Sequence, residues 1–164
     1  FKREYDKNGD LAKRGEIDYQ LLKRMMSDSF FKANHPKSTG FEKFNMRWLE
    51  RQIRLTGYKI TNENVLTTLS YFTITTVAQE LNKDNSREKK VFVYGGGVKN
   101  QLIIDGILGS IKQKRVKKMN FGISEKNLEA TAFAWLSYKR IKGQKITSPM
   151  ITGKKSPSFL GNIY

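Results

Sequence analysis

Three consecutive glycines, Gly95, Gly96 and Gly97, are the feature of this sequence best suited to ligand binding. They follow the apolar run 91–94, which predicts a buried strand, and they precede a helical pattern that starts beyond Asn100. Glycine has no Cβ, so a ligand can approach the backbone closely, and a helix start favours polar or negative groups. Nucleotides bind at such strand ends in α/β proteins. The segment matches neither the G-x-G-x-x-G fingerprint nor a P-loop, so an ordinary tight turn remains an equal alternative.

A second candidate is the turn Pro36-Lys37-Ser38-Thr39-Gly40. Its hydroxyls, lysine and glycine could hold a phosphate or a sugar. The simpler interpretation, which the local sequence favours, is a serine–threonine cap for the helix that follows. Glu129 is a third candidate, although an acid near a helix start is often explained by the helix dipole alone.

The remaining polar residues exclude several kinds of site. The chain has no Cys and one His, which removes thiolate zinc sites and thiol nucleophiles and argues against His-based metal clusters and Ser–His–Asp catalysis, so we expect no metal-ligating residues in it. His35, next to a proline in a loop, is predicted to face solvent, and so is Asp105.

The charge is strongly positive: 31 Lys and Arg against 15 Asp and Glu give +16 over 164 residues. This excess makes a basic nucleic-acid-binding module the alternative function. Lysine dominates, however, and the basic runs 112–118 and 139–145 have no interleaved aromatics for base stacking, so we favour solvated faces and no specific nucleic acid. No apolar run is long enough to span a membrane.

The hydrophobic pattern predicts a helix-rich α/β protein. Helices are expected over 17–28, from 44 to near Gly57, over 61–81, from about 101 to Gly109, and over 124–141, with strands at 91–94 and 116–119. The last helix should bury Leu128, Ala132, Trp135 and Leu136. Segment 61–81 is ambiguous: its Thr and Val content favours strand, but its spacing favours one helix capped by Thr61. We expect this helix, a single domain over 1–164 and a small residual sheet.

Taken in order, the motifs resemble one known family. The anhydro-N-acetylmuramic acid kinases, which have an actin/hexokinase-like (ASKHA, ribonuclease H-like) fold, contain similar segments. In chain order the matches are Pro36-Lys37-Ser38-Thr39-Gly40 with Glu42, Phe44, Asn45, Trp48 and Leu49; Gly95-Gly96-Gly97 with Asn100; Glu129-Ala130 with 132–136; and Thr152-Gly153 with 160–164. Phe41 departs from the usual arginine of the family.

The resemblance implies a cytoplasmic bacterial enzyme that uses ATP and Mg²⁺, acts as a homodimer, and serves cell-wall recycling. It would hydrolyse the 1,6-anhydro ring of anhydro-N-acetylmuramic acid and phosphorylate O6. Gly95, Gly96, Gly97 and Asn100 would line the adenosine side of the cleft, and Glu129 and residues 37–40 would lie on its sugar or interlobe side. The family's phosphate loop and catalytic aspartate segment do not occur here. The chain is therefore expected to be the C-terminal part of the kinase, with the general base elsewhere and no activity alone.

Overall fold

The structure, a computed structural model, describes residues 5–83, 91–112, 116–118, 122–123, 127–147 and 153–161. They belong to two compact units. The first comprises Phe1–Lys32 and Thr39–Met119, and the second comprises Ala33–Ser38 and Asn120–Tyr164. Each unit is described separately below.

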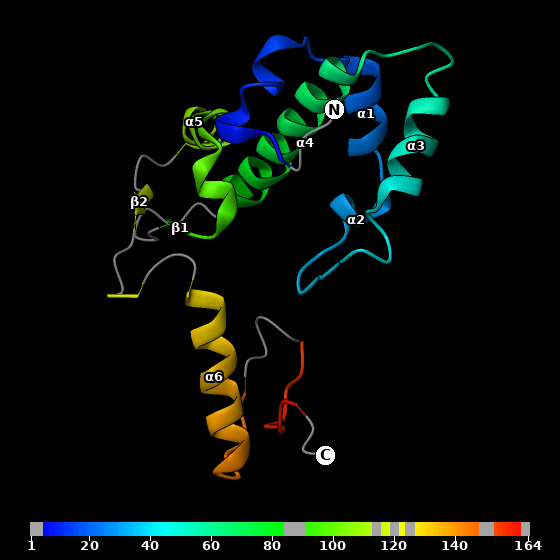
Figure 1. The fold of residues 1–164 in the computed structure, drawn as a ribbon. Helices are drawn as coiled ribbons and strands as arrows, with labels where there is room; N and C mark the ends of the chain where they lie inside the picture. The colour runs from blue at the N-terminus through cyan, green and yellow to red at the C-terminus, as the bar shows by residue number, and fades with distance from the viewer. Residues whose placement is uncertain are drawn as a thin grey trace. The chain divides into compact units, whose positions relative to one another are not determined.

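Helix α4 (Asn62–Lys83) is the centre of the first unit (Figure 1). On one side it packs against α5 (Gln101–Ser110), where Ile74 and Ala78 meet Ile107 and Ile111 in a buried cluster. On the other side α1 (Tyr19–Met26) and α3 (Met46–Arg54) enclose a second cluster around Leu21, Met25 and Leu49. The short helix α2 (Ser29–Lys32) follows α1. One long helix thus joins two separate cores.

The ambiguity over 61–81 is resolved in favour of the helix. Thr61 stands before α4, and its Oγ1 accepts a hydrogen bond from the Asn64 amide at 3.2 Å, as a cap does. The hydroxyls of Thr67 and Thr68 donate to the carbonyls of Glu63 and Asn64, so they can be buried without loss of hydrogen bonding. The β-branched residues that favoured a strand are tolerated because their side chains pair within the helix.

The buried threonines also fasten the N-terminal segment to α4. Thr67 Oγ1 donates to the Ala12 carbonyl at 2.6 Å, and the Asp18 amide donates to Thr68 Oγ1 at 2.9 Å. This segment forms turns, the 3₁₀ helices η1 (Lys7–Gly9) and η2 (Ala12–Arg14). The turns are not merely superficial, because Leu11 and Ala12 are buried.

Strands β1 (Val91–Val93) and β2 (Val116–Lys118) pair in parallel and are joined through α5, as the β–α–β pattern predicts. The 3₁₀ helix η3 (Gly96–Lys99) lies between β1 and α5. Helix α5 does not end at Gly109 but runs through it to Ser110, since a glycine inside a helix weakens it without breaking it. The described residues form a helix-rich α/β arrangement with a two-stranded sheet.

Three other helices differ from the predictions. Helix α1 begins after Asp18, whose side chain caps it by accepting from the Leu21 amide at 2.8 Å. The short helix α2 extends to Lys32, in a segment for which no helix was predicted. Helix α4 extends to Lys83, beyond the predicted end at Leu81, and residues 84–90 lie outside the described residues.

The second unit consists of α6 (Leu128–Ile141) and the segments beside it. The tail returns along α6: Ile146 and Ser158 form an antiparallel bridge, and Arg140 Nε donates to the Gly161 carbonyl at 3.1 Å. Residues 124–126, predicted to begin this helix, lie outside the described residues.

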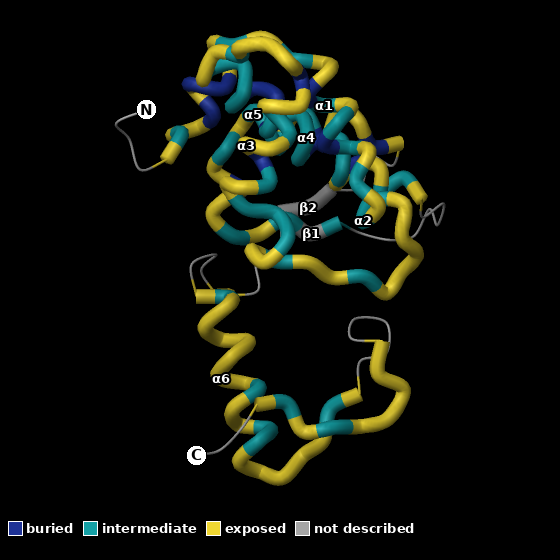
Figure 2. The backbone as a smooth tube through the Cα atoms, turned by 90° about the vertical axis from the view of Figure 1, so that its right-hand side faces the viewer, coloured by how far each residue is buried: buried dark blue, intermediate teal, exposed yellow. Residues whose placement is uncertain are grey.

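The predicted burial of α6 is wrong. Ala132 is exposed and Trp135 is 49% exposed, while Leu128 and Leu136 are half-buried. Most of α6 is coloured as exposed in Figure 2. A helical apolar pattern marks a face that needs a covering layer. Among the described residues, the short tail is too small to provide it over the whole helix.

Candidate functional site

Gly95 is required by its backbone conformation. Its φ of 88° and ψ of −178° lie in a region open essentially to glycine alone. Gly95 therefore turns the chain from β1 into η3.

Gly96 and Gly97 differ from Gly95 because neither has a positive φ. Among the described residues, a Cβ added to either would have no atom within 4 Å, other than those of its chain neighbours. Packing within the described part of the chain thus gives no reason for glycine at these two positions. The bare backbone leaves space that a ligand can use.

The two glycines border a pocket of about 450 Å³. This volume lies in the ordinary range for small-molecule sites. The wall facing η3 comes from the N-terminal turn, which was not among the candidate sites predicted from the sequence. The lining residues are Tyr5, Asp6, Lys7, Asn8, Gly96, Gly97, Lys99, Asn100 and Ile103.

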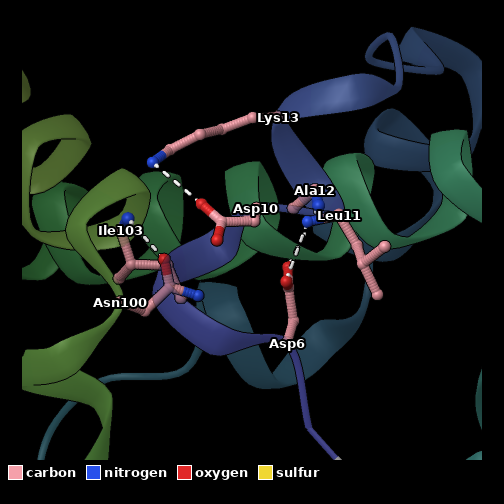
Figure 3. A network of polar contacts seen from close by, with 7 residues as sticks. All are labelled: Asp6, Asp10, Leu11, Ala12, Lys13, Asn100 and Ile103. Atoms are coloured by element: carbon pink, nitrogen blue, oxygen red, sulfur yellow. Dashed lines mark hydrogen bonds and ion pairs between the residues drawn. The ribbon is translucent and has the colours of Figure 1, made fainter. Parts of the chain in front are cut away.

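Asn100 connects the pocket to helix α5. Its Oδ1 accepts from the Ile103 amide at 3.3 Å and caps α5 (Figure 3). The N-terminal turn lies against this side chain: a Cβ on Gly9, whose φ is +74°, would fall 2.5 Å from Asn100 Oδ1. A glycine at position 9 therefore lets the turn and the glycine loop meet.

Asp6 holds the N-terminal turn in shape. Its two carboxylate oxygens accept from the amides of Leu11 and Ala12 at 2.8 and 3.0 Å (Figure 3). The sequence offered a signal for this role, an aspartate followed by Asn8-Gly9, but without a partner in view it indicated only a turn.

Residues 37–40 fall at the boundary between the units. Lys37 and Ser38 belong to the second unit, and Thr39 and Gly40 belong to the first. The expected serine–threonine cap is wrong, because α3 begins later and is capped by Asn45, whose Oδ1 accepts from the Trp48 amide at 3.0 Å. The segment is thus not needed to start that helix.

The chain after Gly40 is anchored by an aromatic cluster. Neighbouring rings lie with centroids 4.9–5.9 Å apart in edge-to-face or tilted pairs, a favourable arrangement. Lys43 lies over two of these rings and forms an ion pair of 2.6 Å with Asp28. The rings are Phe30, Phe31, Phe44, Trp48 and Phe72.

The same ion pair sets the acidity of Asp28. Burial by itself raises the pKa of this carboxyl, but the hydrogen bond and charge of Lys43, with the Phe30 amide at 2.9 Å, outweigh it. The net result is a pKa below the ordinary 3.8. Asp28 is therefore ionised at neutral pH and structural in role.

Glu129 lies in the first turn of α6 and is exposed. It belongs to the second unit, whereas the glycine pocket belongs to the first. His35 is exposed, as predicted, and so is Asp105, which accepts from Gln101 Nε2 at 2.7 Å.

The sequence has no aromatic residue within the basic run 139–145, but the structure places aromatic rings from neighbouring segments beside it. Lys139 lies over Trp135 at 5.5 Å and Lys142 over Tyr138 at 6.0 Å, because residues four apart are neighbours on a helix. The returning tail brings Phe159 under Arg140 and Lys145. Residues 113–115 of the other basic run lie outside the described residues.

A second pocket, of about 400 Å³, lies between α6 and the tail. Its lining is largely apolar, with Phe133, Leu136 and Ile141 on the helix and Leu160 on the tail.

Over the described ranges, no helix is both long and apolar enough to cross a membrane. Within those same ranges, no group of three potential metal-ligating side chains comes together.

A parallel β–α–β unit with a glycine turn at a pocket is an arrangement that nucleotide-binding proteins use. The family model described as anhydro-N-acetylmuramic acid kinase matches residues 1–164. The chain belongs to this family, as the motif resemblance indicated.

Curated relatives carry the same family name. "Anhydro-N-acetylmuramic acid kinase" of Sulfurovum sp. (strain NBC37-1) is 35% identical over 162 residues, which are 98% of this chain and 43% of the relative. The protein of that name from Actinobacillus pleuropneumoniae serotype 7 is 36% identical over 165 residues, 99% of this chain and 44% of the relative. That of Pseudomonas fluorescens is 36% identical over 162 residues. The chain thus spans less than half the length of the relatives it matches.

Proposed function

We propose that this chain is the nucleotide-side, C-terminal portion of an ATP-dependent kinase of anhydro-N-acetylmuramic acid. The observation that carries the proposal is the exposed backbone of Gly96 and Gly97 at a pocket of about 450 Å³. None of the described residues around them requires glycine there. Close approach of an adenosine group would require it.

The pocket residues fit this ligand. Gly95 sets the turn, Gly96 and Gly97 offer bare backbone, and Asn100 holds the adjoining helix start. In the proposed enzyme, ATP supplies the phosphoryl group and Mg²⁺ neutralises its phosphates. We assign no residue of this chain to the metal. The β–α–β unit would form part of the family's ASKHA fold, and residues 1–164 would form one partial C-terminal domain.

The substrate side of the proposal rests on family membership. The enzyme would open the 1,6-anhydro ring and phosphorylate O6 of the sugar. Glu129, Lys37, Ser38, Thr39 and Gly40 are the proposed cleft residues in this chain. Ser38, Thr39 and Glu129 are exposed, and Lys37 and Gly40 are half-buried.

The chain by itself should be catalytically inactive. Phosphoryl transfer depends on groups positioned on both sides of the reacting phosphate, and this chain supplies one side. The general base would lie outside it. We further propose a cytoplasmic enzyme acting as a homodimer, a state that light scattering on the whole protein measures directly.

The test is a substitution of Gly96 by valine in the whole protein. A valine side chain would project into the pocket, and overpacking of about 1–3 kcal/mol corresponds to a rise of roughly 5- to 150-fold in the KM for ATP. The KM for the sugar should stay the same. Gly109→Val is the matched control, because Gly109 also has open space and no positive φ but does not line the pocket. An unchanged dependence on ATP in Gly96→Val would contradict the proposal.

A further inference from the structure

The pocket at the glycine loop has two walls, and only one comes from the segment recognised in the sequence. The other wall is the N-terminal turn, with Tyr5, Asp6, Lys7 and Asn8. The short 3₁₀ helix η1 begins at Lys7 and ends at Gly9. Because Gly9 packs against Asn100, this contact holds the N-terminal turn in position beside the glycine loop.

The charged side chains that line the pocket differ in whether they have partners. Asp6 uses both carboxylate oxygens for the Leu11 and Ala12 amides. Lys7 and Lys99, one from each wall, are exposed and make no ion pair within the part of the chain that the structure describes. With one carboxylate against two lysines, the lining keeps a net positive charge.

We infer that Lys7 and Lys99 bind the phosphate groups of the nucleotide from opposite walls of this pocket. The inference rests on the proposed function, since it specifies how that same site holds its ligand. A lysine ammonium attracts phosphate as a point charge and gives little to an uncharged nucleoside. The two lysines should therefore distinguish nucleotide from nucleoside.

Isothermal titration calorimetry on the whole protein, with ADP and with adenosine, tests this inference. Lys7→Met and Lys99→Met should each weaken ADP binding about two- to fivefold, as expected for exposed ion pairs, with adenosine affinity unchanged. The double variant should multiply the losses. Lys13→Met is the control: it removes the same charge nearby, but Lys13 pairs with Asp10 at 3.7 Å and does not line the pocket.

The outcomes separate the two claims. If the unaltered protein binds neither ADP nor adenosine, the proposed function fails. If it binds both and the lysine variants bind ADP as well as the control does, only the phosphate assignment is overturned. Equal weakening of ADP and adenosine would also overturn it, because that result would mean that the lysines shape the wall without contacting phosphate.

Discussion

Gly106, where α5 crosses α4, offers the sharpest test of how the glycine loop is supported. A Cβ at this position would lie 2.9 Å from Ile74 Cγ1 and 3.2 Å from Cγ2, with Ile74 Cδ1 nearer still. Carbon atoms prefer about 3.5–4.0 Å, so the helices would have to separate by roughly 0.5–1 Å. Ile74 is 3% exposed and has little room to move away.

Gly106→Ala therefore sets two effects against each other. Alanine should gain about 0.5–1 kcal/mol over glycine inside a helix, but overpacking should cost about 1–3 kcal/mol. We expect a net loss of about 1 kcal/mol or more in the free energy of unfolding, measured by urea denaturation with circular dichroism. Gly109→Ala, in the same helix with no atom within 4 Å, should instead stabilise by about 0.5–1 kcal/mol.

A double variant isolates the contact. In an Ile74→Ala background the three crowding carbons are gone, so Gly106→Ala should become neutral or stabilising, with a coupling energy of about 1–3 kcal/mol. If Gly106→Ala stabilises the unaltered background as much as Gly109→Ala does, the close helix crossing is wrong.

Two further substitutions probe the groups that hold the site. Asp28→Asn should reduce stability by about 1–3 kcal/mol at neutral pH. Because the folded pKa is below 3.8, the stability that ionised Asp28 contributes is present above that pH and is lost as the pH falls through the folded pKa. A destabilisation that does not shrink in acid-range unfolding curves would contradict the ion pair with Lys43. Gly9→Ala should displace Asn100 and so weaken the binding of ADP and of adenosine alike, as measured by calorimetry. The control is Gly57→Ala, which has a similar φ of +82° but no described atom within 4 Å and should leave both affinities unchanged. Equal effects of the two substitutions would mean that backbone strain alone is responsible.

Periodicity predicted most of the elements because the responsible contacts are local. The spacing of Val65, Leu69 and Phe72 marks one face of α4, and Thr61 caps it, so the helix could be predicted despite its β-branched residues. The strand–glycine–helix order likewise placed Gly96 and Gly97 between β1 and α5.

The pocket's second wall could not be predicted, because it depends on contacts far apart in the sequence. Asp6 and Gly9 are ordinary turn residues until Asn100 is seen beside them. The prediction that α6 is buried was wrong for a different reason. Its apolar pattern correctly indicated a helix with an apolar face, but such a pattern does not say which segment covers Trp135.

The central claim is that Gly96 and Gly97 receive an adenine nucleotide. A crystal structure of the whole protein with a non-hydrolysable ATP analogue tests it most directly. We predict adenosine density against the backbone of these two glycines, with phosphate density facing Lys7 and Lys99. Density for the analogue elsewhere, with this pocket filled only by solvent, would contradict the account.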